Sequence, residues 1–159
     1  MLDGYIGEKR QKIDNDLLIH PGARIIVENA RGEFLCIVRS DNGNLGLPAG
    51  GIEPNETIVE CIIRETKEET GLNIQNPVVI GISTKPDLET VEYPNGDKTQ
   101  YFSIEFYTNQ YTGTLQLNPN EATSVAFKPT SFVAQLPVNE QMSFESLTYF
   151  RQTGQVNMR

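Results

Sequence analysis

The clearest pattern of apolar and polar positions in this chain is helical, and it runs from residue 57 to residue 71. Ile58, Ile62, Glu65 and Glu69 follow one another at spacings of four, three and four, so they share one stripe of a helix. A stripe that begins with isoleucines is expected to face protein. The pattern therefore predicts a helix that turns two glutamates toward the inside of the molecule.

Both ends of this helix carry recognisable boundary signals. Thr57 followed by Glu60 is a capping box, in which the hydroxyl accepts a hydrogen bond from the first turn and the carboxylate reaches back. Gly71 can adopt the left-handed conformation of a C-terminal cap. Glu60 and Lys67 lie off the apolar stripe and are expected to face solvent.

Runs with strand character lie on either side of the helix. Ala23–Glu28 and Glu33–Arg39 flank the turn-forming residues 29–32, and we expect them to pair as a hairpin. Residues 86–99 are polar and predict a loop with a turn at Pro94–Gly96. Three later runs predict strands: Val78–Thr84, Gln100–Tyr111 and Ala122–Phe127.

The two ends of the chain are expected to be helical. Residues 5–18 predict a short amphipathic helix, and His20 is expected in the turn before Pro21. Toward the other end, residues 132–136 predict one helical turn and Asn139 is expected to cap a final helix. Strands around a central helix, with further helices at the ends, predict the α/β class with a mixed sheet covered on both faces.

A length of 159 residues suits a single domain with its own core. We divide it into an N-terminal helical arm at residues 1–21, a core at residues 22–137 and a C-terminal helix at residues 138–159. The arm is expected to cover the sheet or a second copy of the chain, as in a homodimer.

Composition limits the partners and the compartment. Lys and Arg number 13 against 21 Asp and Glu, and the resulting net charge of -8 argues against a nucleic-acid polymer as partner. Cys36 and Cys61 form no CxxC pattern and are expected to be reduced core residues. We find no membrane-spanning apolar run and no signal-peptide pattern, so we expect a soluble, cytoplasmic protein without a membrane partner.

Three glutamates on the central helix suggest a metal site. Glu65, Glu68 and Glu69 stand at i, i+3 and i+4, so their carboxylates converge on one face. Like charges turned toward a cleft repel one another and need a compensating cation. Oxygen ligands select hard ions, which favours Mg²⁺ or Mn²⁺. A solvated charge face and a structural acidic helix that binds Ca²⁺ are the alternatives.

Glycines and charged residues recur around these glutamates at set spacings. The positions are Gly50, Glu56, Arg64, Glu65, Glu68, Glu69, Gly71 and Leu72. Together they resemble the signature of the Nudix (MutT-like) hydrolases. Thr66 replaces an aliphatic residue of that signature, and Asn55 replaces a common glycine, although asparagine also tolerates positive φ. The resemblance implies an α/β/α sandwich with a mixed sheet.

By the same resemblance, the residues of this signature, which we call the box (Gly50 to Leu72), take defined roles. Glu56 and Arg64 would form an ion pair that holds the loop to the helix. Gly50 and Gly51 would let the backbone approach the substrate closely. The metal ligands that it implies are Glu65, Glu68, Glu69 and the backbone carbonyl of Ala49.

Two further roles fall outside the box. Arg39 ends the strand that leads toward the box, so it is preferred to Arg24 as a phosphate contact. A carboxylate near the metal but not bound tightly to it makes the better general base. We choose Glu121 for this role, with Glu89 and Glu92 as rivals and a solvated loop glutamate as the alternative. The expected catalytic set is Glu56, Arg64, Glu65, Glu68 and Glu121.

The resemblance also narrows the reaction. It implies hydrolysis, by water attack on a phosphorus, of a nucleoside diphosphate linked to another moiety. Pro48–Gly51 is similar to the loop of ADP-ribose and nucleotide-sugar pyrophosphatases, and Pro86, fourteen residues past Leu72, supports the same group. The chain lacks the N-terminal strand extension of many such enzymes, so a MutT-type (d)NTP pyrophosphatase is the alternative. A non-catalytic nucleotide-sensing Nudix module is a third reading, disfavoured because no box carboxylate is missing.

Overall fold

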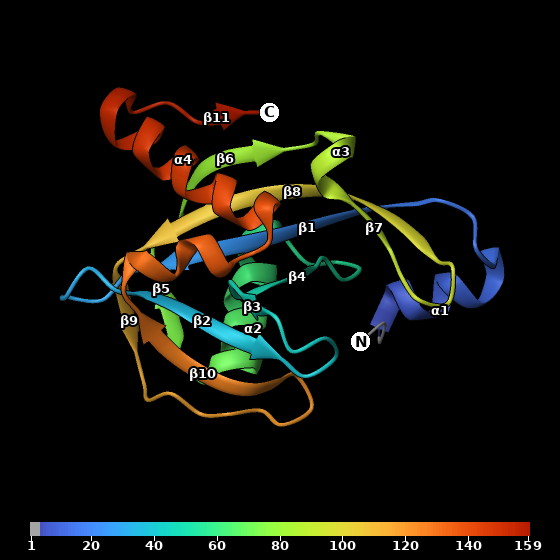
Figure 1. The fold of residues 1–159 in the computed structure, drawn as a ribbon, viewed down its shortest axis with the longest axis horizontal. Helices are drawn as coiled ribbons and strands as arrows, with labels where there is room; N and C mark the ends of the chain where they lie inside the picture. Colours follow the sequence, from blue (N-terminus) through green and yellow to red (C-terminus); the bar gives the residue numbers. More distant parts are fainter. Residues whose placement is uncertain (1–3) are drawn as a thin grey trace.

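The computed structural model describes residues 4–159, and its largest sheet lies between helices (Figure 1). This six-stranded sheet has the order β11-β6-β8-β1-β4, with β7 paired to β8. β1 and β8 lie parallel at its centre, from Leu18 opposite Thr99 to Val27 opposite Thr108. β4 runs antiparallel to β1, and β6 runs antiparallel to β8 but parallel to β11. Its strands are β1 (Leu18–Val27), β4 (Ala49–Gly51), β6 (Val78–Ser83), β7 (Thr90–Glu92), β8 (Lys98–Thr108) and β11 (Asn157–Met158).

Helices cover both faces of this sheet. Ile25 of β1 packs in one buried cluster with Ile62 of α2, while the next residue, Ile26, packs in another with Leu147 of α4. Successive strand residues point to opposite faces, so β1 is buried on both sides. The expected α/β/α sandwich with a mixed sheet is confirmed. The helices are α1 (Gly4–Ile13), α2 (Ile58–Thr70), α3 (Pro86–Glu89) and α4 (Val138–Thr153), with a 3₁₀ helix η1 (Thr130–Gln135) where one helical turn was expected.

A second sheet overturns the expected hairpin. β2 (Phe34–Arg39) pairs with β10 (Ala122–Lys128) and β3 (Leu45–Gly46), and only the bridge between Glu28 and Phe34 links it to β1. The turn itself forms, because Asn29 N donates to the Glu33 carbonyl at 2.9 Å. Apolar runs buried on both faces do not specify their partners, so the pattern could not show that the two strands diverge. A short pair, β5 (Asn73–Gln75) and β9 (Gln110–Thr112), completes the strands.

The sheet begins earlier than expected. α1 ends at Ile13 and β1 begins at Leu18, so the last residues of the expected arm belong to the central sheet. His20 is not in a turn: it lies in β1 opposite Tyr101 of β8, and only 8% of it is exposed. Residues 1–3 of the expected arm lie outside the described residues.

The segment at residues 86–99 is more ordered than the expected loop. It contains α3, β7 and the first residues of β8, and β7 and β8 form a hairpin. The expected turn closes this hairpin, because Gly96 adopts a φ of 89° and its N–H donates to the Tyr93 carbonyl at 2.9 Å. Polar residues on a strand with one exposed face look like a loop in sequence.

The last helix begins differently from the prediction. Pro137 occupies the N-cap position of α4, and Asn139 instead donates to Glu89 at 3.5 Å. The helix ends at Thr153, where Gly154 takes a φ of 70°, and the chain then adds β11 beside β6.

One expectation from composition agrees with the fold. Cys36 and Cys61 are free and buried. Within residues 4–159, no helix combines the length and the apolar character needed to cross a membrane.

Candidate active site

The signals at the ends of α2 act as expected. Thr57 Oγ1 accepts from Glu60 N at 3.2 Å, and a Glu60 carboxylate oxygen accepts from Thr57 N at 2.8 Å. Gly71 adopts a φ of 81° and donates to the Lys67 carbonyl. Thr66, at the aliphatic position of the box, is fully buried and donates to the Ile62 carbonyl at 2.7 Å, so its methyl can pack while its hydroxyl has a partner.

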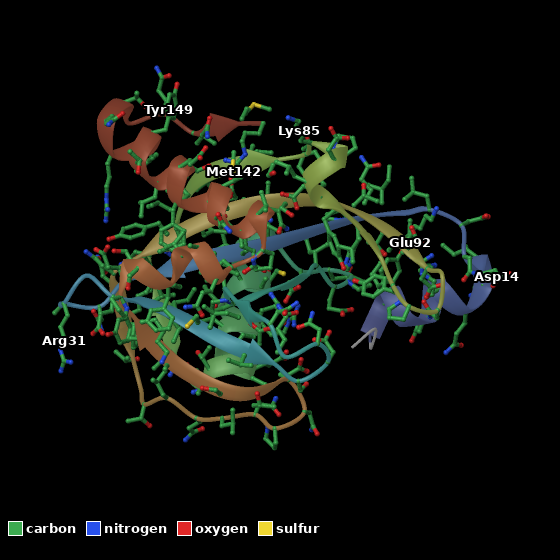
Figure 2. The ribbon with its side chains drawn as sticks, viewed as in Figure 1. Asp14, Arg31, Lys85, Glu92, Met142 and Tyr149 are labelled. Atoms are coloured by element: carbon green, nitrogen blue, oxygen red, sulfur yellow. The ribbon has the colours of Figure 1, made fainter. Side chains whose placement is uncertain are left out.

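A cavity of about 1030 Å³ lies beside the inner face of α2. Its acidic end is lined by Glu65, Glu68 and Glu69. His20 and Tyr101 line it as well, so the cavity also reaches the strands of the central sheet. A smaller hollow of about 430 Å³ lies by the turn at Arg31, which Figure 2 labels at the opposite end of the molecule from Asp14, and it contains none of the candidate residues.

Glu69 is the most deeply buried of the three glutamates. It is 4% exposed, and its carboxylate accepts from Ala49 N at 3.0 Å. Burial raises the pKa of Glu69 to about 8; Arg39 opposes the shift and the charge of Glu65 adds to it. The carboxylate therefore lacks a cation that fully offsets its burial.

Glu65 and Glu68 are turned toward an arginine. Arg64 Nη1 donates to Glu65 at 2.7 Å and to Glu68 at 3.3 Å. Burial raises the pKa of Glu65, and Arg64 works against that shift. Gly50 lies directly against Glu65, because a Cβ at this position would stand 2.0 Å from the Glu65 carboxyl carbon. Glycine therefore leaves room for the Glu65 carboxylate in this orientation.

Arg64 also ties the box loop to the helix. Its Nε donates to Glu56 at 2.6 Å, and its Nη2 donates to Glu56 at 3.0 Å and to the Gly51 carbonyl at 3.2 Å. These bonds from Arg64 lower the pKa of Glu56. Asn55, beside Glu56, has a φ of 65°, which explains how it stands in for a glycine. The expected ion pair therefore forms.

The glutamates of α2 carry oxygen ligands that suit a hard divalent cation, but their side chains are not oriented to hold one. Across residues 4–159, no three acidic, histidine or cysteine side chains converge on one point that could hold a metal ion. Glu65 and Glu68 are instead paired with Arg64. The all-oxygen donor set and the buried carboxyl group of Glu69 fit Mg²⁺ or Mn²⁺ in chemistry. Their role as ligands stays a prediction.

Of the three candidate bases, Glu121 lies near the box glutamates. It lines the cavity, and its charge adds to the raised pKa of both Glu65 and Glu69. The main chain holds its loop, because Ser40 N donates to the Glu121 carbonyl at 3.1 Å.

Its two rivals are otherwise engaged. Glu89 is 1% exposed and accepts from Arg24 at 2.8 and 3.1 Å and from Ser83 at 2.5 Å. Burial acts to raise the pKa of Glu89, but the bonds from Arg24 and its other donors hold it below its usual value. Glu92 is an exposed residue of β7, labelled in Figure 2, that lies 3.8 Å from Lys98.

The two arginines considered for phosphate both have protein partners. Arg24 is buried rather than surface-charged, and it is held by Glu89 and Glu105. Arg39 lines the cavity, but its Nη2 donates to Glu140 at 3.0 Å and to the Leu47 carbonyl at 3.3 Å. A phosphate contact by Arg39 therefore stays a prediction and would have to compete with Glu140.

Sequence reasoning missed several residues that line the cavity. Glu140, in the first turn of α4, accepts from both Arg39 and Leu47 N. His20, Tyr93 and Tyr101 line it from β1 and the β7–β8 hairpin. Strand alternation was the signal that could have found His20. If His20 is placed in a strand, it points to the same face as Gly22, two residues on, which is buried.

An α/β/α sandwich with this acidic helix beside a cavity belongs to a known class of fold. The crystal structure of a MutT protein from Methanosarcina mazei superposes with a TM-score of 0.68 over 87% of this chain and 99% of that one, at 22% identity. The NUDIX domain of Shewanella oneidensis NrtR, complexed with ADP ribose, superposes with a TM-score of 0.64 over 89% and 92%, at 18% identity.

The chain is a member of the NUDIX domain family, whose pattern matches residues 18–146. Among curated relatives, an ADP-ribose pyrophosphatase of Methanocaldococcus jannaschii is 35% identical over 85 residues, which cover half of each chain. An RNA pyrophosphohydrolase of Yersinia pestis is 28% identical over 143 residues, covering 82% of this chain and 79% of that protein. The matched region spans only about half the length of the first of these relatives.

Proposed function

We propose that this protein is a metal-dependent pyrophosphohydrolase that cleaves a nucleoside diphosphate linked to another moiety. ADP-ribose and nucleotide sugars are the favoured substrates. The observation that carries the proposal is the gathering of Glu65, Glu68, Glu69 and Glu121 along one cavity. Its volume of about 1030 Å³ can accommodate a substrate of this size.

Each residue of the site has a stated task in this reaction. A bound divalent cation neutralises phosphate oxygens and makes water a better nucleophile. Glu121 accepts the proton of the attacking water, since it stands outside the ligand set. Arg64 and Glu56 fix the loop relative to the helix, and Gly50 leaves room for Glu65. The residues that would hold the cation are Glu65, Glu68, Glu69 and the Ala49 carbonyl.

Several features support an ADP-ribose or nucleotide-sugar substrate. The Pro48–Gly51 loop is similar to that of such enzymes, one relative is named an ADP-ribose pyrophosphatase, and one structural neighbour was solved in complex with ADP ribose. Another relative is named for RNA pyrophosphohydrolysis, and the structural neighbours include MutT proteins. A (d)NTP pyrophosphatase is therefore the second candidate, and a nucleotide-sensing module without turnover is the third.

A hydrolysis screen separates these candidates. Phosphate release is measured with Mg²⁺ or Mn²⁺ on ADP-ribose, nucleotide sugars, dinucleotides, (d)NTPs and a 5′-triphosphorylated RNA. A phosphatase reveals monophosphate products of the first three classes, and an inorganic pyrophosphatase reveals pyrophosphate released from the triphosphates, each with a control that lacks the protein. We expect activity on one of the first two classes, loss with EDTA, and recovery when metal is restored. Turnover that survives EDTA contradicts the metal dependence. No turnover across the panel would leave the sensing module.

A further inference from the structure

We propose that the end of the cavity between α1, β1 and the β7–β8 hairpin is a subsite for the nucleobase, and that His20 forms a hydrogen bond with the edge of that base. The inference rests on the proposed function and names the part of the substrate that this end receives. Part of its outer wall, α1, lies before the region matched by the family.

His20 is a buried polar side chain without a protein partner. It is the only histidine, 8% exposed, and it lines the cavity. Among the residues that the structure describes, neither ring nitrogen of His20 has a hydrogen-bond partner. The ring lies against the backbone of Gly51, where a Cβ would stand 2.0 Å from the imidazole Cε1. A buried polar group without a partner is costly, so a ligand that supplies one would bind here favourably.

The expected charge state of His20 suits the edge of a base. Burial lowers the pKa of His20, although Glu53 and the Ile52 backbone oppose the shift. The imidazole is therefore neutral near pH 7 and offers one N–H donor and one nitrogen acceptor. Nucleobases carry donors and acceptors of the same kind along their edges.

Aromatic and apolar groups line the cavity together with His20. The ring of Tyr101 lies 5.8 Å from the imidazole, centre to centre, and the hydroxyls of Tyr101 and Tyr93 bond to each other at 2.7 Å. Val91 of β7 and Ile6 of α1 add apolar surface to the same cavity. Such a lining favours a planar ring with apolar faces.

This lining distinguishes a base from a sugar. A sugar carries a hydroxyl on most of its carbons, and each buried hydroxyl needs a partner. The hydroxyls of Tyr93 and Tyr101 are already bonded to each other, and the Glu53 carboxylate in the same cavity already accepts from Tyr5 N, so these groups would not serve sugar hydroxyls without losing a partner. A base needs only a few polar contacts at its edge, so it is the better match.

The wall of this subsite is held in place. Arg10 of α1 is buried, and it donates to the Lys98 carbonyl at 2.8 Å and to Thr99 Oγ1 at 2.9 Å. Tyr5 N donates to Glu53 at 3.2 Å. Figure 1 shows α1 beside the tip of the β7–β8 hairpin, and both contribute residues to the lining of the cavity. A wall formed before binding reduces the entropy lost when a ligand is ordered.

A single NMR signal tests the proposal. In the untagged full chain with Mg²⁺, the imidazole Cε1–H resonance belongs to His20 alone. We expect AMP to shift this resonance saturably, and ribose 5-phosphate, which has the same sugar and phosphate but no base, to leave it in place. If AMP leaves the resonance unmoved, or ribose 5-phosphate shifts it equally, the proposal is overturned. No hydrolysis is involved, so the result is independent of the proposed activity.

Kinetics with the substrate identified by the hydrolysis screen give a second test. His20→Ala is expected to raise KM about tenfold with kcat within about twofold, because the contact is made equally in the ground and transition states. Tyr149→Phe is the control, since Tyr149 is exposed on α4 and bonds to Gln155 away from the cavity. An unchanged KM in a folded His20→Ala variant would overturn the proposal.

Discussion

Glu69 occupies a position where ionisation is unfavourable. Its carboxyl group is buried beside Glu65 and has a single backbone donor at Ala49, and with a pKa of about 8 it is largely protonated at pH 7 in the metal-free protein. Glu69→Gln keeps the bond from Ala49 N and removes an ionisable group whose raised pKa destabilises the fold. We therefore expect hydrolysis to fall by about a hundredfold or more, while the metal-free protein unfolds at an equal or higher temperature. Turnover assays and thermal unfolding check both parts, and a variant that unfolds yet retains turnover contradicts the ligand role.

Glu121 is tested by the change that removes only its basicity. Glu121→Gln should lower kcat by about a hundredfold and leave metal affinity nearly unchanged, since the residue stands outside the ligand set. Metal titration and steady-state kinetics provide the two readouts. A loss of kcat below about threefold would return the general base to Glu65.

Glu89 provides a contrast, because its carboxylate stabilises the fold. Glu89→Gln would leave Arg24 with only Glu105 as a charged partner in a buried environment. We expect the free energy of unfolding to fall by about 3 kcal/mol. Urea unfolding measures this loss. A stable variant with strongly reduced kcat would instead make Glu89 the base.

The box residues could be predicted one by one, whereas His20 and Glu140 could not. Spacing on one helix places Glu65 and Glu69 on the same face wherever that helix lies in the molecule. Glu140 reaches its partners Arg39 and Leu47 only through the packing of α4 against strands far away in sequence. His20 depends likewise on a strand whose main partner is β8.

At the scale of elements, the bond network of Arg64 links the box loop to α2. Arg64→Ala removes the three hydrogen bonds that Arg64 donates to the loop residues Glu56 and Gly51. The free energy of unfolding should therefore fall by roughly 2 kcal/mol. Hydrolysis should fall as well, because the loop carrying Ala49 loses its support. Chemical unfolding and kinetics are measured together; Arg31→Ala, an exposed position outside the cavity, serves as control. Loss of activity without loss of stability would mean that Arg64 acts on substrate directly.

Element boundaries were predictable where the deciding chemistry is local. α2 begins and ends where its caps predict, since Thr57, Glu60 and Gly71 act on their own neighbours. The prediction that β1 and β2 pair as a hairpin was wrong, because the partners of a strand are decided by residues elsewhere in the chain. The same limit concealed the β7–β8 hairpin, whose strands carry many polar residues.

At the scale of the whole molecule, a buried ionic network joins the C-terminal strand to the centre of the sheet. Glu105 of β8 is fully buried and accepts from Arg24 at 3.3 Å, Arg159 at 2.9 Å and Ser146 at 2.9 Å. The network therefore connects β1, β8, α4 and the segment after β11.

Removing one arginine tests how much this network contributes. Arg159→Ala should lower the free energy of unfolding by about 3 kcal/mol, because Glu105 keeps its charge and loses a close partner. Arg151→Ala is the matched control: its pair with Glu28 at 3.2 Å is half exposed and should be worth less than about 1 kcal/mol. Urea unfolding at two salt concentrations measures both, and equal losses would contradict the role of burial.

The parallel pairing of β1 with β8 also has a kinetic consequence. Leu18 meets Thr99 and Val27 meets Thr108, so the ladder at the centre of the sheet closes a large loop of chain. Contacts between residues so distant in sequence slow folding, because chain entropy is lost before the contacts form. During synthesis, β1 must stay unpaired with β8 until the ribosome has released that strand. An apolar strand without a partner is prone to aggregate, so the time between the emergence of β1 and that of β8 is when the nascent chain is most vulnerable.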